Sequence, residues 1–386
     1  MNSALGEKMK LLRDQLGMTQ QQVAEAVGVT SGEYISMLEA GRRMPSLSVL
    51  EKLAALFGRD VSYFLSEDKP VFTMLLRAEG LRLKEKTELQ RFDQLCRNYA
   101  FVEELVEAAP PLAPAYDAPP SIRVKTYKGM QRYAEELADT ERKRLGLGDE
   151  PIKDIFMLLE RQGIHPVRLQ LGKDSKLAGA LVYNSAMGAF VLVNGSDSRD
   201  RQAFTAAHEY CHFLKDRQEG LTLDQVGMVG DGADDDRPPK EKIADLFAAN
   251  FLMPATAVQR QIGDRRRIGP EEALYLKMYF GVSYQAMVIR LLSLGWIGKD
   301  ESRALRQMSP RALETRFLGA PREDDAEPEK IPPRLLRLAI QAYTDEKITL
   351  SRLSELLDST PPEMRRLLAE SGLSKSSGEE RAKGPR

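Results

Sequence analysis

The feature that most constrains the fold of this chain is the segment His208-Glu209-Tyr210-Cys211-His212. The chain has only three histidines, and two of them stand four residues apart here. Because an α-helix completes one turn in about 3.6 residues, side chains at positions i and i+4 lie on the same face of the helix. Two imidazoles at this spacing can bind one metal ion while the glutamate between them faces the open coordination position. The segment therefore predicts a helix that carries a zinc-binding pair, with Glu209 as the catalytic base.

A catalytic zinc site needs a third protein ligand and keeps a fourth position for water. Glu241 and Asp245 are also four residues apart, and the helical face that they share continues into apolar residues. A carboxylate pair on such a face points toward the core, where it needs a partner. We expect Glu241 to bind one Zn²⁺ per chain, and Asp245 to accept a hydrogen bond from His208 and so fix its tautomer.

Zinc lowers the pKa of its bound water to about 7, and Glu209 would take the proton and return it to the leaving amine. Tyr183 and Tyr210 are nearby candidates for stabilising the oxyanion. Cys211 is expected to be a small core residue, with metal ligand and oxidation target as alternatives. His165 precedes a proline at a strand start and is expected to be structural. Four aspartates further along could bind a cation but are expected to lie in a solvated loop: Asp231, Asp234, Asp235 and Asp236.

Composition excludes a uniformly basic nucleic-acid coat protein, because the 56 Lys and Arg residues are balanced by 57 Asp and Glu residues. Two cysteines are too few for a disulfide framework. No apolar run approaches membrane-spanning length, and the first residues lack a signal-peptide pattern. These observations predict a cytoplasmic protein with no membrane contact, and 386 residues suffice for two or three domains.

The spacing of apolar residues predicts a mainly α protein with a small β-sheet, of the α+β class. Residues 1–67 are expected to form a bundle of short helices, and residues 72–120 a polar-rich linker helix followed by a proline-rich linker. Residues 121–318 hold the metal motif. A helical tail follows at 334–370, and the polar residues 371–386 are expected to be disordered.

Strands are expected within the domain of the metal motif at residues 166–171, 178–183 and 189–193. Residues 216–240 contain many Asp and Gly and are expected to be a long loop. The helical tail has a helix-turn-helix appearance, but a docking or dimerisation appendage is the preferred interpretation.

The metal motif lies within a longer pattern of residues. The pattern comprises Arg201 to Glu209, Glu241 to Ala249, Phe251-Leu252-Met253-Pro254, Phe280-Gly281-Val282-Ser283, Arg290-Leu291 and Leu294-Gly295. It resembles the ImmA/IrrE family of metallopeptidases over residues 126–300, roughly. The resemblance implies a zincin-like fold and zinc-dependent cleavage of a repressor protein, in a switch triggered by stress or mobile elements. It supports the roles given to Glu241 and Asp245, although family members usually have glycine where this chain has Cys211.

A second pattern lies near the N-terminus. It comprises Met18-Thr19-Gln20, Val23-Ala24, Gly28-Val29, Ile35-Ser36, Leu38-Glu39, Gly41, Pro45-Ser46 and Leu50. It resembles the XRE/Cro type of helix-turn-helix, which implies that residues 31–39 form a helix that enters the major groove of a double-stranded DNA operator. The residues expected to contact DNA are Gln20, Ser31, Gly32, Glu33, Ser36, Met37, Arg42 and Arg43.

Seven basic and seven acidic residues balance over residues 1–66, so one copy should bind phosphates weakly. A homodimer that reads two half-sites is therefore expected. A protein-docking module is the alternative interpretation of this bundle.

Three functions are compatible with these patterns. The first is a DNA-binding transcriptional regulator with a zinc-dependent endopeptidase domain that cleaves a repressor protein. The second is a transcription factor whose zincin-like domain does not cut and senses a ligand or partner. The third is an antitoxin-like or anti-phage module that sequesters a partner. The presence of His208, Glu209, His212 and Glu241 together favours the first.

Overall fold

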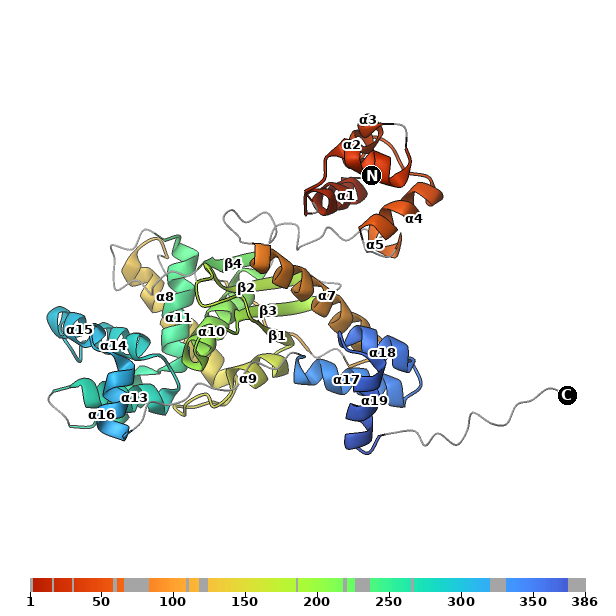
Figure 1. Cartoon of the computed structure of the whole chain (residues 1–386). Helices are drawn as coiled ribbons and strands as arrows, with labels where there is room; N and C mark the ends of the chain where they lie inside the picture. Colours follow the sequence, from red (N-terminus) through yellow and green to blue (C-terminus); the bar gives the residue numbers. More distant parts are fainter. Residues whose placement is uncertain are drawn as a thin grey trace. The chain divides into compact units, whose positions relative to one another are not determined.

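The computed structural model of the chain forms two compact units, residues 1–82 and 83–386. Both contain mostly helices, and a small sheet lies in the second, which confirms the α+β class (Figure 1). The four aspartates of the expected loop and residues 374–386 lie outside the described residues. The structure describes residues 3–15, 17–29, 31–57, 61–65, 83–108, 111–117, 124–184, 187–217, 221–225, 237–264, 267–319 and 331–373.

The first unit is a bundle of short helices. These are α1 (Ser3–Gln15), α2 (Gln20–Val27), α3 (Gly32–Glu39), α4 (Leu47–Leu56) and α5 (Val61–Leu65). Thr19 begins α2 with a capping box, and Gly28 ends it with φ 71°, in the left-handed region that favours glycine. A Cβ atom on Gly6 would collide with the backbone oxygens of Leu38 and Glu39, so glycine allows α1 to pack closely on α3. The helix α5 was not predicted.

The sheet of the second unit has four strands in the order β1-β3-β2-β4. They are β1 (Ile164–Leu169), β2 (Leu177–Asn184), β3 (Gly188–Asn194) and β4 (Leu221–Gln225). Strand β1 runs parallel to β3, whereas β2 is antiparallel to β3 and to β4. The prediction that residues 216–240 form one long loop is wrong, because β4 lies within them. A five-residue strand carries little periodic signal, and its pairing with β2 is what defines it.

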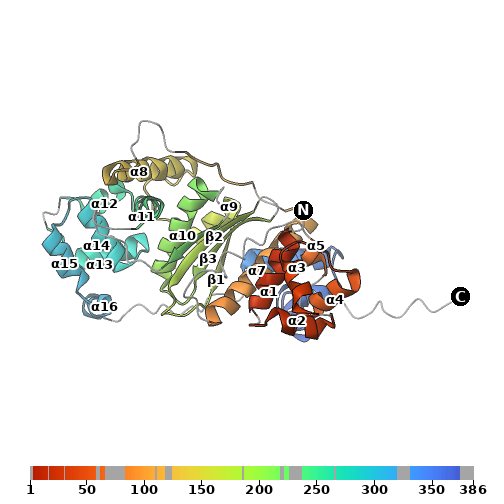
Figure 2. The same cartoon turned by 90° about the horizontal axis from the view of Figure 1, so that it is seen from above.

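Two helices cover opposite faces of this sheet. Helix α10 (Arg199–Lys215) packs against β2 and β3. Helix α7 (Leu83–Leu105) lies on the other side and contacts β1 and β3, as Figures 1 and 2 both show. Strand β3 is therefore buried from both sides, which explains its nearly continuous apolar sequence.

Further helices form a layer beyond α10. Helix α11 (Pro239–Leu252) packs on α10, and α8 (Tyr127–Arg144) packs on α11. Helix α9 (Ile155–Arg161) contacts β1 and α10. The helices that follow α11 are α12 (Ala255–Ile262), α13 (Pro270–Phe280), α14 (Tyr284–Ser293), α15 (Lys299–Arg306) and α16 (Pro310–Leu318). The helix that carries the metal motif is thus enclosed between the sheet and α11.

The proline-rich segment between α7 and α8 is bound to the rest of the second unit over residues 111–117. The amide of Ala113 donates a hydrogen bond to the carbonyl of Gln162 at 3.0 Å. The amide of Tyr116 donates a hydrogen bond to the carbonyl of Leu214 at 2.8 Å. Arg217 donates to the carbonyl of Ala113 at 2.7 Å. These bonds hold the segment against the end of α10.

The tail consists of α17 (Pro333–Thr344), α18 (Leu350–Leu356) and α19 (Pro361–Glu370), and α17 packs on α7. Asn98 donates to the carbonyl of Leu356 at 2.8 Å, and Arg334 pairs with Glu103 at 2.8 Å. The tail therefore docks on the helix that precedes the sheet. Among the helices of the described ranges, none combines the length and the apolar character needed to cross a bilayer.

Candidate functional site

The metal motif lies on α10, a helix of 17 residues. Ser198 caps its start by accepting a hydrogen bond from the amide of Arg201. Apolar residues on both sides of the motif are fully buried, so the helix lies in the core. This burial extends to His208, Glu209 and His212, which are at most 1% exposed.

Three metal-ligand atoms converge where α10 meets the start of α11. The Nε2 atoms of His208 and His212 are 3.1 Å apart. The Oε2 atom of Glu241 lies 3.2 Å from Nε2 of His208 and 3.5 Å from Nε2 of His212. All three ligand atoms lie within 4.8 Å of one another, and no second group of this kind occurs among the described residues.

The second nitrogen of each histidine is held by a carboxylate. Nδ1 of His208 lies 2.9 Å from Oδ1 of Asp245, and Nδ1 of His212 lies 2.8 Å from Oδ2 of Asp216. Each imidazole therefore donates its Nδ1–H outward and directs the Nε2 lone pair toward the shared point, which is the arrangement that metal-binding histidines adopt. The sequence pattern indicated Asp245. It did not indicate Asp216, although that residue stands four positions after His212.

Both supporting carboxylates also contact a cation. Arg237 lies 2.7 Å from Oδ2 of Asp245, and Lys215 lies 2.6 Å from Oδ1 of Asp216. An ionised carboxylate that is held on two sides stays in a fixed orientation. The carboxylates of Asp245 and Asp216 are therefore held in place while they orient the histidines.

The charges at this point explain two pKa shifts. Burial alone would raise the pKa of Glu241, but the adjacent imidazoles of His208 and His212 outweigh burial and hold the pKa far below its usual range. Burial alone would lower the pKa of His212, but the carboxylates of Asp216 and Glu241 beside it outweigh burial and raise the pKa. The cluster thus favours a cation beside Glu241.

Glu209 lies against strand β2, where a Cβ atom on Gly179 would be 2.9 Å from its Oε1. No side chain separates this glycine from the helix, so α10 approaches the sheet closely here. The sequence pattern did not indicate a role for Gly179. The signal that could have identified it is a glycine in the middle of an apolar strand.

Other predicted residues lie elsewhere. Tyr210 donates its hydroxyl to buried Glu141 at 2.7 Å, so this hydroxyl is not available to stabilise an oxyanion. Cys211 is fully buried and lies outside the group of metal-ligand atoms, and burial raises the pKa of its thiol well above the usual value. It is a core residue. His165 stacks on Tyr99 and pairs with Glu103, which agrees with a structural role.

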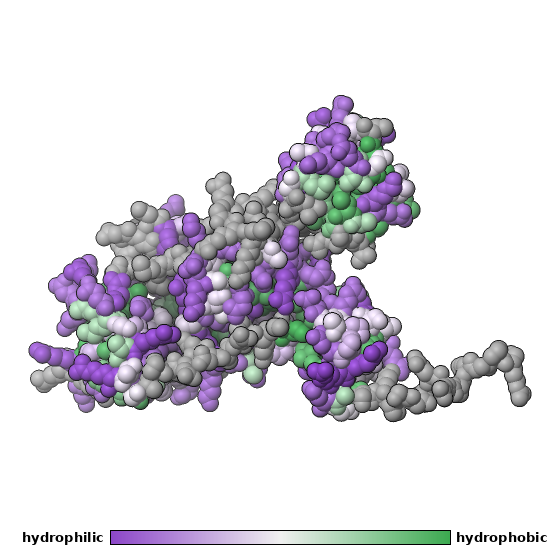
Figure 3. Space-filling model, viewed as in Figure 1, coloured by the Kyte–Doolittle hydropathy of each residue, from purple (hydrophilic) through white to green (hydrophobic). Residues whose placement is uncertain are grey.

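The candidate DNA-contacting residues lie on and around α2 and α3 of the first unit. Helix α3 begins after Ser31, and Glu33 is exposed while Ser36 and Met37 are partly exposed. Arg42 and Arg43 follow the helix and are exposed, and Arg43 lies 4.9 Å from the ring centroid of Tyr34. In the view of Figure 3, the end of this unit that α2 and α3 form is mainly hydrophilic.

Two of these residues make contacts inside the first unit. Gln20 donates its side-chain amide to Glu39 at 2.8 Å, and Arg13 pairs with the same carboxylate. The backbone amide of Gly32 donates to the side chain of Gln21 at 2.9 Å. These three contacts fix α3 against α1 and α2, which is a positioning role that sequence reasoning did not identify.

The donor set suits a catalytic zinc ion. Two imidazole nitrogens and one carboxylate oxygen are the protein ligands of one common class of such sites, and the fourth position belongs to water or substrate. The orientation of both Nδ1 atoms toward carboxylates is the second observation that fits this metal.

Two family models match the chain. The IrrE N-terminal-like domain, Peptidase_M78, matches residues 159–292, which include His208, Glu209, His212 and Glu241. The helix-turn-helix model, HTH_3, matches residues 9–64, which span α2 and α3. The two matches fall in the two separate units.

The first unit is also similar to curated regulators. The HTH-type transcriptional regulator PuuR of Escherichia coli (strain K12) is 37% identical over 68 residues, which are 17% of this chain and 36% of that protein. PuuR of Shigella flexneri matches equally. The chain therefore spans about a third of the length of these relatives. An uncharacterized HTH-type transcriptional regulator of Methanothermobacter thermautotrophicus is 46% identical over 48 residues, 12% of this chain and 68% of its own length. This chain belongs to the HTH-type transcriptional regulators, and its second unit carries an IrrE N-terminal-like domain of a metallopeptidase family.

Proposed function

We propose that this regulator binds one zinc ion through His208, His212 and Glu241 and hydrolyses a peptide bond in a repressor protein. The observation that supports the proposal most directly is the convergence of two Nε2 atoms and one carboxylate oxygen on a single point, with both Nδ1 atoms held by Asp245 and Asp216. A structural histidine pair would not need both rings turned in this way.

The roles of the residues follow from this geometry. When bound, zinc supplies Lewis acidity, which lowers the pKa of a water molecule and polarises a carbonyl. Glu209 lies between the two histidines in sequence and acts as the general base that takes the proton and delivers it to the leaving amine. Asp245 and Asp216 keep the imidazoles in the tautomer that presents Nε2. Burial of the histidines excludes bulk water from the ligands.

The proposed operator is double-stranded DNA, read by α3 in the major groove. Glu33, Ser36 and Met37 face the bases, and Arg42 and Arg43 bind phosphates. The balanced charge of the first unit makes a single copy a weak binder, so a homodimer on two half-sites is part of the proposal. Such a protein works in the cytoplasm, in a switch that responds to stress or to mobile DNA.

The proposal is tested with purified full-length chain and a repressor encoded beside it. Zinc content and repressor cleavage would be measured for wild type and for Glu209→Gln, with Cys211→Ala as a core variant outside the ligand set. We expect zinc in all three proteins and cleavage in wild type and Cys211→Ala only. Zinc without cleavage by the wild type would instead support a domain that senses a ligand or partner.

A further inference from the structure

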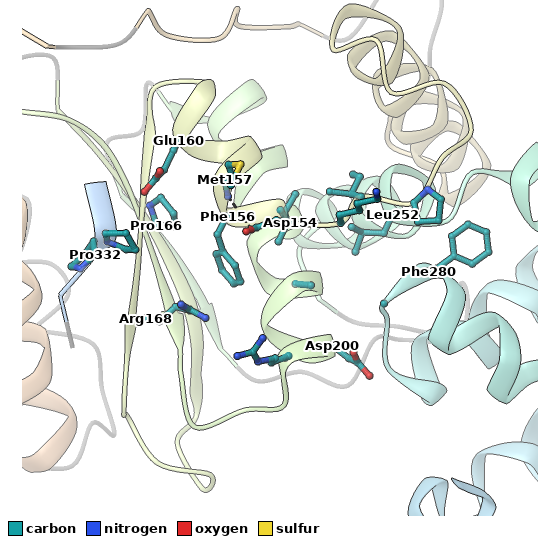
Figure 4. Close-up of a pocket in the computed structure, with 18 of the residues that line it drawn as sticks. Asp154, Phe156, Met157, Glu160, Pro166, Arg168, Asp200, Leu252, Phe280 and Pro332 are labelled. Atoms are coloured by element: carbon teal, nitrogen blue, oxygen red, sulfur yellow. Dashed lines mark hydrogen bonds between the residues drawn. The ribbon is translucent and has the colours of Figure 1, made fainter. Parts of the chain in front are cut away.

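A cavity of about 670 Å³ lies in the second unit, and none of the proposed metal ligands lines it. Its walls come from α9 and the loop before it, from β1, from the first turn of α10 and from the ends of α11 and α13. Figure 4 shows Phe156 and Arg168 near its centre, Glu160 and Pro332 at one end, and Phe280 at the other. The volume falls within the range of small-molecule sites.

Part of the cavity lining is apolar. Phe156 of α9 and Phe280 of α13 contribute aromatic rings, and Val167 and Leu252 contribute buried aliphatic side chains. Apolar and aromatic walls of this kind stabilise the hydrophobic body of a ligand, because burying apolar surface is favourable.

Two guanidinium groups from different elements line the same space. The guanidinium of Arg168 on β1 lies 4.9 Å from the ring centroid of Phe156, and Arg199 is the first residue of α10. A guanidinium that stacks on a ring keeps its N–H edges in a fixed plane, which suits a carboxylate or phosphate. The N-terminal end of the 17-residue helix α10 adds a favourable dipole for an anion.

The carboxylates in the lining are already engaged or lie at one end. Asp154 caps α9 by accepting from the amide of Met157 at 3.0 Å. Asp200 pairs with Lys277 at 3.2 Å. In Figure 4, Glu160 lies at the end of the cavity where Pro166 and Pro332 lie, away from Asp200 of α10, and burial raises its pKa. The part of the cavity around Arg168 and Arg199 is therefore the part that favours negative charge.

We propose that this cavity binds a small organic anion, with its carboxylate or phosphate group at Arg168 and Arg199 and its apolar body on Phe156 and Phe280. Such a ligand would contact the same helix that carries His208 and His212 and would be an effector of the regulator. The inference does not depend on zinc or on peptide hydrolysis, since the cavity shares no residue with the metal centre.

The test uses full-length chain and isothermal titration with two anions, naphthalene-1-acetate and 1-naphthyl phosphate. The neutral isostere naphthalene-1-acetamide reports whether charge matters. Arg168→Gln and Arg199→Gln remove the proposed contacts. Arg132→Gln is the matched control, because Arg132 is an exposed arginine on α8 outside the cavity.

We expect one anion per chain, with affinity at least about tenfold higher than for the amide, since charge-assisted hydrogen bonds are the stronger kind. Each cavity variant should weaken anion binding by a similar factor, and Arg132→Gln should not. Arg199 is exposed, so its replacement leaves the fold intact and remains informative if Arg168→Gln unfolds. Equal binding of acid and amide, unchanged affinity in Arg199→Gln, or no saturable binding of either anion at millimolar concentration would overturn the proposal.

Discussion

Gly179 of β2 lies directly against Glu209 of α10. A Cβ atom on Gly179 would be 2.9 Å from Oε1 of Glu209 and 2.5 Å from Cγ2 of Thr205. Side chains in well-packed cores do not approach this closely, so an alanine at Gly179 must displace the glutamate or the helix. The orientation of the proposed general base thus depends on a residue of the sheet.

Gly179→Ala is therefore expected to reduce repressor cleavage by about 10²-fold, because a small displacement of a catalytic group can cost that much. Zinc content should stay unchanged, since none of the three ligands is among the atoms nearest to that Cβ. Cleavage rate and zinc content are measured together. Gly298→Ala is the control, because the nearest atom to its Cβ would be 3.6 Å away. Full activity of Gly179→Ala would contradict this account of Glu209.

Asp216→Ala is expected to weaken zinc binding by about 10- to 100-fold, the usual effect of removing a residue that orients a metal-bound histidine. Asp245→Ala should have an effect of the same size, because the two acids hold the two histidines in the same way. Zinc affinity is measured by competition with a chelator. Asp300→Ala serves as the control, since the side chain of Asp300 is 95% exposed. An unchanged affinity in Asp216→Ala would show that His212 needs no orienting partner.

Glu103 makes a pH-dependent contribution to stability. Burial would raise its pKa, but hydrogen bonds from His165 and Arg334 outweigh it and lower the pKa. A carboxylate with a lowered pKa binds its proton more weakly when folded than when unfolded. Its stabilising effect is thus complete above its usual pKa of about 4.3 and is lost as the pH falls through the lower folded value.

Glu103→Gln should lower the free energy of unfolding by about 1.5–3 kcal/mol at pH 7, the range for hydrogen bonds to charged groups. The difference from wild type should shrink below about pH 4. Urea unfolding across pH measures both effects. Glu104→Gln is the control on the same helix, because Glu104 is exposed. A difference that does not depend on pH would exclude the charge as the cause.

Replacing residues of the first unit should separate DNA affinity from sequence preference. Arg42→Ala and Arg43→Ala are expected to weaken binding to all duplexes and to reduce the salt slope by about one each. Ser36→Ala should instead reduce the binding free energy that separates the preferred base from the other bases, by about 1–3 kcal/mol. Selection of binding sites followed by titration at several salt concentrations measures both. Loss of sequence preference in Arg42→Ala alone would contradict the proposed orientation.

The sequence predicted the elements that depend on local spacing. The i, i+4 pairs placed His208, His212, Glu241 and Asp245 on two helices, and the structure brings these side chains together. Strand β4 was missed because five residues carry little periodicity and their pairing with β2 is a tertiary property.

The same limit applies to single residues. Asp216 lies at a helical end, where an acidic residue usually contacts solvent, and only the position of the imidazole of His212 reveals its role. Gly179 has meaning only once α10 crosses the strand. The contacts of Gln20 and Gly32 inside the first unit also depend on how three helices pack, which spacing along the chain does not determine.

The metal centre is tested most simply by the zinc content of the purified chain after its metal has been removed with a chelator and zinc has been added back. We expect one zinc ion per chain for wild type and for Cys211→Ala. We expect loss of zinc from His208→Ala, His212→Ala and Glu241→Ala, with each variant still folded by circular dichroism. Absence of zinc from the wild type, or equal zinc in wild type and Glu241→Ala, would contradict the claim that these three side chains form the metal centre.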